Sequence, residues 1–383
     1  MKILFNLKQD MLHGSSYGGA ESSIVLLGKK LNERGHQSVY YTKGKNVWFL
    51  PLVKRRKLYG MPYIFYHAIR GQRFKLVKRF NNFVFNKNVK LNNYDIIYAH
   101  YDLNFLELIN ELKVDDAKPK IIMRMAGMRW YEESKKSKAI RERFEKTFNQ
   151  IDSVNFISSG LKDLVDKKFD ELDMNVNFKH SFIGDIGSSF KPGREVSYQD
   201  VQDDTFDIVM ATRFSSYQKR QDILVEAAKI VNDKIPFHLT LVGSGPEQAK
   251  IKDYICENNL QDKVTVLPFL PQEELWNLMM RSDLLCHSVE YEGLGKIIIE
   301  SMAMGLPVLT SNVTPMNSYI HDGGNGFLVD NDPKLWAERI IQLYNNYKLR
   351  AIVSNNSIEY VREKYDPDKN VSVYEKNFKK LCT

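Results

Sequence analysis

The stretch DLLCHSVEYEGLGKIIIESMAMGLPVLTS, Asp283 to Ser311, decides the fold of the second half of the chain. Its apolar start, DLLCHS, is typical of a buried strand, VEYEGLG of a turn, KIIIESMAM of a helix, and PVLTS of another strand. Gly305, followed by Pro307, is a stop signal for this helix. A strand, a helix and a strand in this order predict a βαβ unit, whose two strands are parallel.

Two carboxylates stand out in this stretch. Glu300 falls in the second turn of a helix that is apolar nearly all round, and Glu292 precedes Gly293 and Gly295 at the helix start. A buried carboxylate costs several kcal/mol unless it is paired or hydrogen-bonded. Ribose hydroxyls would satisfy Glu300, and so would a neighbouring Lys or Arg; the pattern alone favours neither. The free N–H groups at the helix start suit a phosphate.

Short apolar runs recur along both halves of the chain and alternate with amphipathic stretches of helical spacing. This alternation predicts parallel sheets with helices on both faces. The segment from Phe190 mixes Pro, Gly, Ser and acidic residues, as a linker does. The expected strands are KILFN, QSVYYT, YDIIYAH, PKIIMRMAG and SVNFISS in the first half, and FDIVMAT, FHLTLVG, VTVLPF, DLLCHS, PVLTS and GFLV in the second.

The fold class that follows is α/β, with two doubly wound, Rossmann-like domains. We place the first at residues 1–190 and the second at residues 191–365. A last helix is expected at 366–383, and packing against the first domain is one option for it. Two such domains that face each other leave a cleft at the carboxyl ends of their strands, where sheets of this type usually bind ligands.

The composition is that of an ordinary globular protein. Of 383 residues, 43% are hydrophobic and 27% charged, which allows two sizeable cores. The three cysteines lie far apart, which argues against a disulfide framework and suits a reducing compartment. MKILFNLKQDM is not a signal peptide, and no stretch approaches the ~20 apolar residues that span a bilayer. We expect a cytoplasmic protein, either free in solution or peripheral at the inner face of the membrane.

The net charge of +8 is unevenly distributed. Between Glu33 and Asp95 there is no acidic residue, whereas 14 Lys and Arg residues occur there. From Lys54 to Lys90 the cations are interleaved with Phe, Tyr, Leu and Ile, a mixture that suits an anionic membrane or acceptor. A solvated basic face whose aromatic residues belong to the core explains the mixture equally well. Nucleic acid is the weakest of the three interpretations, and we expect none as a partner.

Further candidate residues follow other strands of the second half. Arg213 comes after FDIVMAT, and Lys219 lies six residues later. Cations at the carboxyl edge of a sheet suit a diphosphate, although either residue could also be an ordinary surface charge. LVGSGPEQ places Gly243 and Gly245 after the next strand, where a close backbone approach or a simple turn explains them.

EYEGLGKIIIESMAMGLPVL resembles the E-x7-E signature of the retaining, nucleotide-sugar-dependent glycosyltransferases of family four, the glycosyl transferases group 1. The similarity continues in ATRFSSYQKRQDILVEAA, LTLVGSGPE, VTVLPFLPQEELWNLMMRSDLLCHS and HDGGNGFLV, and so covers nearly all of Phe206 to Val329. Several motifs in the same order make the match specific. The family has the GT-B fold, which implies two facing Rossmann-like domains with an interdomain cleft.

The resemblance implies a role for each matching residue. Arg213 and Lys219 would hold the diphosphate and stabilise the departing nucleotide. Glu292 would bind hydroxyls of the donor sugar, and Glu300 those of the ribose. The remaining substrate contacts, mostly through the backbone, would come from Gly18, Gly19, Gly127, Gly243, Leu270, Gly293, Leu294 and Gly295.

The sequence departs from the family pattern in the first domain. At the end of the strand matched by PKIIMRMAG, many relatives have a His that contacts the donor sugar near the reaction centre, whereas this chain has Met125 to Gly127 there. His100, Arg124 and Arg129 are nearby candidates for that role. The departure concerns the sugar and the acceptor rather than the nucleotide site.

The implied activity is retaining transfer of a sugar from a nucleotide-diphosphate donor, with UDP favoured, to a lipid-linked, polysaccharide or other glycan acceptor. Retention in this family is attributed to front-face displacement, in which the donor phosphate takes the proton of the acceptor. No metal or cofactor is expected, because cations and two helix N-termini would stabilise the leaving group. The D-x-D at Asp330 to Asp332 could suggest a Mg²⁺ site, but its position after GFLV and before Pro333 favours a helix cap. The alternatives are a nucleotide-sugar epimerase or phosphorylase, and a non-catalytic glycan- or nucleic-acid-binding module.

Overall fold

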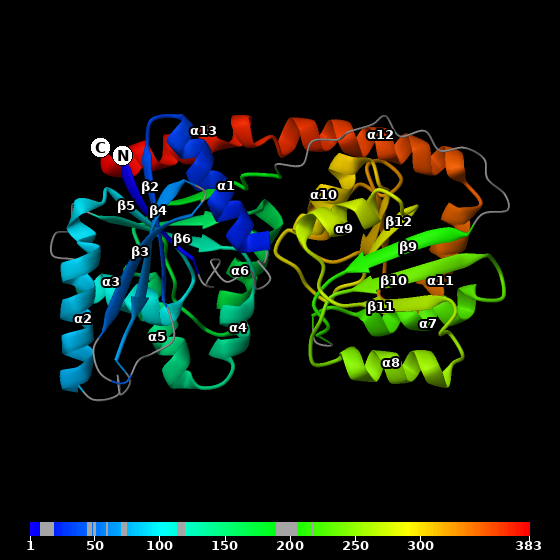
Figure 1. The fold of residues 1–383 in the computed structure, drawn as a ribbon, viewed down its shortest axis with the longest axis horizontal. Helices are drawn as coiled ribbons and strands as arrows, with labels where there is room; N and C mark the ends of the chain where they lie inside the picture. The colour runs from blue at the N-terminus through cyan, green and yellow to red at the C-terminus, as the bar shows by residue number, and fades with distance from the viewer. Residues whose placement is uncertain are drawn as a thin grey trace. The chain divides into compact units, whose positions relative to one another are not determined.

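The computed structural model divides into two compact units. Unit 1 comprises Met1–Ile186 and Pro367–Thr383, and unit 2 comprises Gly187–Asp366; each has its own sheet and core (Figure 1). Residues 190–204 of the expected linker, like Gly18, lie outside the described residues. The structure describes residues 1–7, 19–43, 48, 51–58, 60–69, 75–112, 119–188, 205–215 and 218–383.

Within the described residues, unit 1 contains an eight-stranded sheet in the order β3-β4-β2-β1-β5-β6-β7-β8. From β4 to β8 all neighbouring strands are parallel, as predicted. The strands are β1 Lys2–Asn6, β2 Gln37–Lys43, β3 Leu52–Leu58, β4 Met61–His67, β5 Ile96–His100, β6 Lys120–Met125, β7 Ser153–Phe156 and β8 Ser181–Ile183.

Helices cover both faces of this sheet (Figure 1). Tyr40 of β2 points to α1, where its hydroxyl donates to the carbonyl oxygen of Val25. The next residue, Tyr41, contacts Phe85 of α2 and Phe105 of α3, because successive strand residues point to opposite faces. The helices of unit 1 are α1 Gly19–Glu33, α2 Lys75–Val89, α3 Leu103–Leu112, α4 Arg129–Ser134, α5 Lys138–Phe148, α6 Ser159–Glu171 and α13 Pro367–Cys382.

The basic segment forms two strands that were not predicted from the sequence. In β4 the residues Tyr63 to Tyr66 are at most 7% exposed, so these aromatic and aliphatic side chains belong to the core. Strand β3, LVKRRKL, pairs antiparallel with β4 at the edge of the sheet, which corrects the expectation of a purely parallel sheet. Its row of cations hinders the addition of another strand to this edge.

The last helix, α13, packs against α1 within unit 1. Its residues Tyr374 and Phe378 are buried beside Tyr98 of β5 and Phe182 of β8. At its exposed side, Glu375 forms an ion pair at 3.1 Å with Arg34, the residue that follows α1. None of the helices in the described ranges has the length and hydrophobicity that a membrane crossing needs.

Unit 2 contains, in its described residues, a six-stranded sheet in the order β11-β10-β9-β12-β13-β14. All neighbouring strands in it are parallel, and each was predicted from the sequence. The strands are β9 Phe206–Ala211, β10 Phe237–Val242, β11 Val264–Leu267, β12 Leu284–His287, β13 Val308–Ser311 and β14 Phe327–Val329. The helices are α7 Gln221–Val231, α8 Gln248–Glu257, α9 Gln272–Met279, α10 Lys296–Met304, α11 Pro333–Tyr344 and α12 Tyr347–Lys364.

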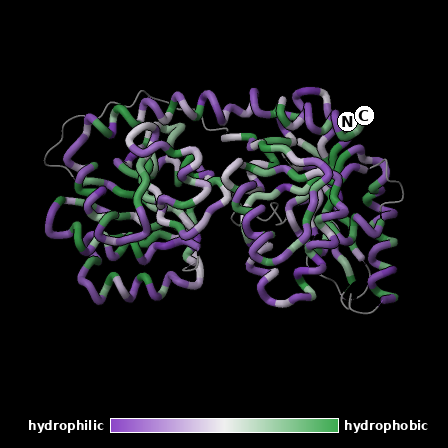
Figure 2. Tube along the Cα trace, turned by 180° about the vertical axis from the view of Figure 1, so that it is seen from behind, coloured by the Kyte–Doolittle hydropathy of each residue, from purple (hydrophilic) through white to green (hydrophobic). Residues whose placement is uncertain are grey.

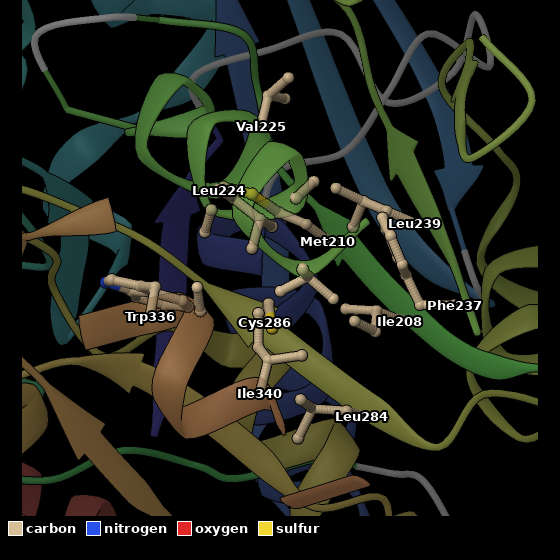
Figure 3. Close-up of a cluster of buried hydrophobic side chains, with 14 of the residues drawn as sticks. Ile208, Met210, Leu224, Val225, Phe237, Leu239, Leu284, Cys286, Trp336 and Ile340 are labelled. Atoms are coloured by element: carbon tan, nitrogen blue, oxygen red, sulfur yellow. The ribbon is translucent and has the colours of Figure 1, made fainter. Parts of the chain in front are cut away.

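The core of unit 2 lies between the sheet and the helices α7 and α11. Figure 3 shows Ile208 of β9 and Leu284 of β12 in one cluster of buried side chains with Trp336 and Ile340 of α11. Cys286 lies in the same cluster with no exposed surface, where the thiol acts as a small hydrophobic group. In both units the hydrophobic residues concentrate along the strands and the hydrophilic residues along the outer helices (Figure 2).

Candidate active site

The predicted site residues of unit 2 gather at one edge of its sheet. Arg213 follows β9, Gly243 follows β10, Leu270 follows β11 and Glu292 follows β12. Because these strands are parallel, their carboxyl ends lie at the same edge. The turn after β12 leads into α10, so this helix also begins at that edge (Figure 1).

Lys219 and Glu292 form a hydrogen-bonded ion pair. Both side chains are largely buried, with 12% and 16% of their surfaces exposed. An isolated β-bridge between Lys219 and Val289 joins the loop before α7 to the loop after β12. His287, the last residue of β12, approaches the same carboxylate oxygen, with its Nε2 3.4 Å from Oε2 of Glu292. One point of the sheet edge therefore holds a cation, a carboxylate and an imidazole.

The surroundings keep Glu292 ionised and His287 neutral. Burial by itself raises the pKa of the Glu292 carboxyl, but Lys219 and His287 outweigh this effect and hold the pKa well below its usual range. Burial and the Lys219 cation lower the pKa of His287, against the opposing effect of Glu292. A neutral imidazole can donate its Nε2–H to Glu292, and this orients the carboxylate.

The start of α10 directs N–H groups toward the site. Gly295 caps the helix with a left-handed φ of 67°, and a Cβ there would lie 3.0 Å from Cδ1 of Ile298. The Gly293 N–H donates to Oε1 of Glu292 at 2.9 Å, and the Leu294 carbonyl oxygen accepts from a tyrosine hydroxyl. The Ile298 N–H donates to the Gly295 carbonyl oxygen at 2.8 Å. The N-terminal end of a helix carries a partial positive charge, so this end of α10 suits an anion.

Glu300 lies one turn further along α10 and is 4% exposed. Its Oε2 accepts hydrogen bonds from the Gln272 amide and the Trp276 indole, both at 3.2 Å. Lys296 Nζ is 3.9 Å from Oε1, which accepts no hydrogen bond among the described residues. Burial raises the pKa of Glu300, against the opposing effects of Lys296 and the two N–H donors. One oxygen of a buried carboxylate is thus held by α9, and the other is available to a hydroxyl.

The remaining predicted residues of unit 2, Arg213, Gly243 and Leu270, lie in loops at the same edge of the sheet. The Arg213 side chain is exposed and forms no ion pair among the described residues. Gly243 has a φ of 142°, and a Cβ there would lie 2.0 Å from the carbonyl oxygen of Thr212, so this position requires glycine. Leu270 is half-buried in the loop between β11 and α9.

In unit 1, Gly19 is the first residue of α1, and Gly127 follows β6 in open surroundings, where an added Cβ would have no atom within 4 Å. Arg124 and His100 are partners in the β5–β6 register, and both are buried. Arg124 forms an ion pair with Asp185 at 3.4 Å. Arg129 pairs with a glutamate one turn along α4 at 2.9 Å. These two arginines therefore have structural partners within unit 1.

Three residues of the site were not predicted from the sequence: Gln272, Trp276 and His287. Gln272 and Trp276 are four residues apart, which places them on one face of a helix, but nothing in the sequence says that this face meets Glu300. His287 lies at the end of a predicted strand, five residues before Glu292. This short distance in the sequence was the signal that could have placed His287 in the site.

The acidic D-x-D motif has the structural role that was expected. Asp332 is the N-cap of α11, and its side chain accepts from the backbone N–H groups of Lys334 and Leu335. Asp330 accepts from the side chain of Asn312 at 3.0 Å. Across the described ranges, no group of His, Cys, Asp and Glu side chains is arranged to hold a metal ion.

Comparison with known proteins finds a glycosyltransferase family. Residues 197–360 match the model of the family Glycosyl transferases group 1. N-acetyl-alpha-D-glucosaminyl L-malate synthase of Bacillus anthracis is 24% identical over 94% of this chain and 93% of that protein. Poly(ribitol-phosphate) alpha-N-acetylglucosaminyltransferase of Staphylococcus aureus is 32% identical over 39% of this chain and 31% of that protein.

Solved structures with the same fold match the whole chain. Anabaena HepE in complex with UDP and glucose gives a TM-score of 0.76 at 17% identity, covering 99% of this chain and 100% of that one. At this identity the likeness concerns the fold alone, and it confirms the expected α/β, GT-B class.

Proposed function

Because residues 197–360 match the group 1 glycosyl transferases, we propose that the chain belongs to this family and transfers a sugar from a UDP-sugar to an anionic or lipid-linked glycan acceptor, with retention of configuration. Sugar transfer from a nucleotide donor follows from the family. The proposal adds four points: uracil as the base of the donor, retention at the sugar carbon, the kind of acceptor, and a reaction that needs no metal. The observation that carries it is the meeting of Lys219, Glu292 and the N-terminus of α10 at the carboxyl edge of the unit 2 sheet.

In this proposal the donor lies along that edge. Its diphosphate contacts Lys219, Arg213 and the first N–H groups of α10, all of which favour negative charge. The ribose hydroxyls bind Glu300, and the base lies near the backbone of Leu270. Glu292 binds hydroxyls of the donor sugar, because a charged acceptor forms stronger hydrogen bonds than a neutral one.

The same groups supply the chemistry. Cleavage of the glycosidic bond leaves a nucleoside diphosphate, whose negative charge grows in the transition state. Preorganised cations and helix N–H groups stabilise that charge without a metal, a type of stabilisation often worth several kcal/mol. In a front-face displacement the departing phosphate takes the proton of the acceptor hydroxyl, so the protein needs no separate base.

The acceptor proposal rests on α2 and β3 of unit 1. On α2, Asn81, Phe85 and Val89 are buried, whereas Leu76 and Phe83 are 78% and 61% exposed. Phe80, 44% exposed, lies between the two along the helix, so the exposed residues form an apolar stripe at helical spacing. The exposed cations of these two elements are Lys75, Lys78, Arg79 and Lys87 on α2 and Lys54, Arg55, Arg56 and Lys57 on β3. Of these, Lys78 forms an ion pair with Glu111 at 2.6 Å.

An exposed apolar stripe bordered by cations suits the surface of an anionic membrane. A pocket of about 460 Å³ lies in unit 1 at the amino ends of β1, β2 and β4. Lys2, Arg55 and Arg56 are among its lining residues, which include no carboxylate. Such a pocket suits a phosphate or carboxylate group of the acceptor or of a lipid. These features support an anionic acceptor presented at a membrane.

A donor assay tests the first half of the proposal. Purified protein is incubated with UDP-N-acetylglucosamine, UDP-glucose, GDP-mannose and ADP-glucose, and free nucleotide and products are measured by mass spectrometry. We expect UDP release from one UDP-sugar, strongly reduced in Lys219→Ala and Glu300→Ala but not in the exposed control Lys250→Ala. Conversion of the donor without UDP release would indicate an epimerase, and unchanged activity in both site variants would contradict the assigned site.

Liposome flotation tests the second half. Binding is expected to anionic vesicles and to fall with ionic strength, and Leu76→Ser with Phe83→Ser should reduce it. The matched control is Ile352→Ser, which removes an apolar residue of unit 2 that is 57% exposed. Binding that depends on neither the salt nor these residues would rule out the membrane surface.

A small dicarboxylic acid is a second candidate acceptor. The nearly full-length match to an L-malate-glycosylating enzyme favours it. Transfer from the preferred donor to L-malate in the same mass-spectrometric assay, without vesicles, would select this acceptor over a lipid-linked one.

A further inference from the structure

His287 is a buried histidine to which the proposed function gives no role. Its side chain is 2% exposed, and its Nε2 is 3.4 Å from Oε2 of Glu292. Its Nδ1 has no hydrogen-bond partner among the described residues. Lys219 binds the same Oε2, so a lysine and an imidazole share one oxygen of one buried carboxylate.

Few charges act on this imidazole. Lys219, from the loop before α7, and Glu292, from the loop after β12, are the charged groups that shift its pKa. Strand β13 lies beside β12 and places Thr310 opposite His287, where the threonine hydroxyl donates to the His287 carbonyl oxygen. Strand β9, on the other side of β12, contributes apolar residues such as Val209. The charge on His287 therefore depends on its two partners.

We propose that donor binding draws Lys219 from Glu292 to the diphosphate, and that the buried His287–Glu292 pair takes up a proton from solvent in exchange. This inference rests on the proposed function, since it requires a diphosphate at Lys219. One ion pair breaks, another forms between Lys219 Nζ and a phosphate oxygen, and the proton replaces the charge that has left Glu292.

The exchange follows from the cost of an uncompensated buried charge. While Lys219 is in place, it neutralises Glu292 and disfavours a second positive charge on His287. Once Lys219 has moved, Glu292 keeps the Gly293 N–H and the neutral imidazole as hydrogen-bond partners but has lost its counter-ion. A partly buried charge without a counter-ion costs several kcal/mol. A proton bound by the pair removes this cost. The two groups titrate as a unit, so the proton belongs to the pair rather than to either residue.

Isothermal titration calorimetry measures this proton directly. UDP-N-acetylglucosamine is titrated into the full chain at pH 7 in buffers of different ionisation enthalpy, and the dependence of the heat on that enthalpy gives the number of protons taken up. A UDP-sugar is the right probe, because the terminal phosphate of free UDP itself titrates near pH ~6. We expect net uptake in the wild type, with an affinity that falls by up to about tenfold per pH unit above neutrality.

Variants assign the proton to the pair. His287→Gln keeps an N–H donor toward Glu292 but cannot titrate, so it should bind donor without uptake near pH 7. Lys219→Met should bind more weakly and also show no uptake, because its pair already carries the proton. The matched control is His238→Gln, which removes a histidine that bonds Thr265 at 2.9 Å in the first half of β10 and should retain uptake.

The outcomes separate the inference from the proposed function. Donor binding by the wild type with no net uptake from about pH 6 to about pH 8, a measurement that needs no variant, overturns the exchange. So does unchanged uptake in His287→Gln that is folded by circular dichroism. If UDP-N-acetylglucosamine and UDP-glucose both fail to bind the wild type, the proposed function itself is wrong, and the exchange with it.

Discussion

Replacing Glu300 by Gln should stabilise unit 2 and weaken donor binding at the same time. The new side chain keeps its size, and its carbonyl oxygen can still accept from Gln272 and Trp276, now 3.2 Å from Oε2. What disappears is a negative charge that is 4% exposed and whose only cation in the described contacts, Lys296, is 3.9 Å away. Relief of that burial should raise the free energy of unfolding by about 1 kcal/mol at neutral pH.

The pH dependence of this gain has a definite sign. Burial raises the pKa of Glu300, so the folded protein binds this proton more tightly than the unfolded chain does. The stability that Glu300 contributes is complete below the unfolded pKa and is lost as the pH rises through the folded pKa. The advantage of Glu300→Gln is therefore expected near neutral pH and should disappear in acid.

Donor affinity should move the other way. A hydrogen bond to a charged acceptor contributes about 1.5–3 kcal/mol and one to a neutral acceptor about 0.5–1.5 kcal/mol. If Oε1 accepts one ribose hydroxyl, its replacement by an uncharged group costs about 1–1.5 kcal/mol, or about a tenfold rise in Kd. The gain in stability corresponds to a rise of roughly 2–4 °C in Tm for a unit of this size.

Calorimetric unfolding over a pH series and titration with UDP-N-acetylglucosamine measure the two effects. The control is Glu290→Gln, which removes a carboxylate in the loop before α10 that is 55% exposed and paired with Arg220. A Glu300→Gln protein that is less stable at neutral pH and binds donor with unchanged affinity would refute the reasoning. That result would make Glu300 a structural partner of Lys296 rather than a ribose ligand.

Three further changes have definite expected results. Trp276→Phe keeps the ring but removes one donor to Glu300, so donor Kd should rise about three- to tenfold in calorimetric titration; an unchanged Kd contradicts the positioning role of α9. Hydrogen bonds from Lys379 and, to a smaller extent, from Arg34 and His36 lower the pKa of Glu375 to about 2. The stability that Glu375 contributes is therefore present at neutral pH and is lost as the pH falls through about 2. Glu375→Gln should therefore lower the free energy of unfolding by about 1 kcal/mol at neutral pH, and a difference that persists undiminished in strong acid contradicts the ion-pair origin. Asp332→Ala should cost about 1 kcal/mol through the lost cap of α11 and leave donor turnover unchanged; a loss of turnover that Mg²⁺ restores would instead indicate a metal role.

The elements of unit 2 were predictable because each follows from local rules. The strands are continuous apolar runs, as a sheet covered on both faces requires, and all six were recognised. Gly305, in the left-handed conformation with φ of 75°, ends α10 where the sequence placed the stop. Asp332 and Pro333 begin α11 for equally local reasons.

The basic segment of unit 1 was not predictable in the same way. LVKRRKL has the cations of a solvated loop, and it becomes a strand because β4 offers it an antiparallel partner at the sheet edge. The interleaved aromatic residues divide between two environments, with Tyr63 to Tyr66 in the core and Phe83 in solvent. Pairing with a partner strand, rather than any local propensity, decides this outcome.

By itself the sequence determined the α/β class, the strand order in the chain, and the presence of Arg213, Lys219, Glu292 and Glu300 near strand and helix ends, since periodicity and glycine punctuation are local properties. Only the tertiary structure decided that Lys219 pairs with Glu292, that His287 shares the same oxygen, and that Gln272 and Trp276 hold Glu300. Those partners lie on different loops and helices, and parallel packing of the strands brings them to one edge. Charge and burial at a site depend on such neighbours, which no local pattern specifies.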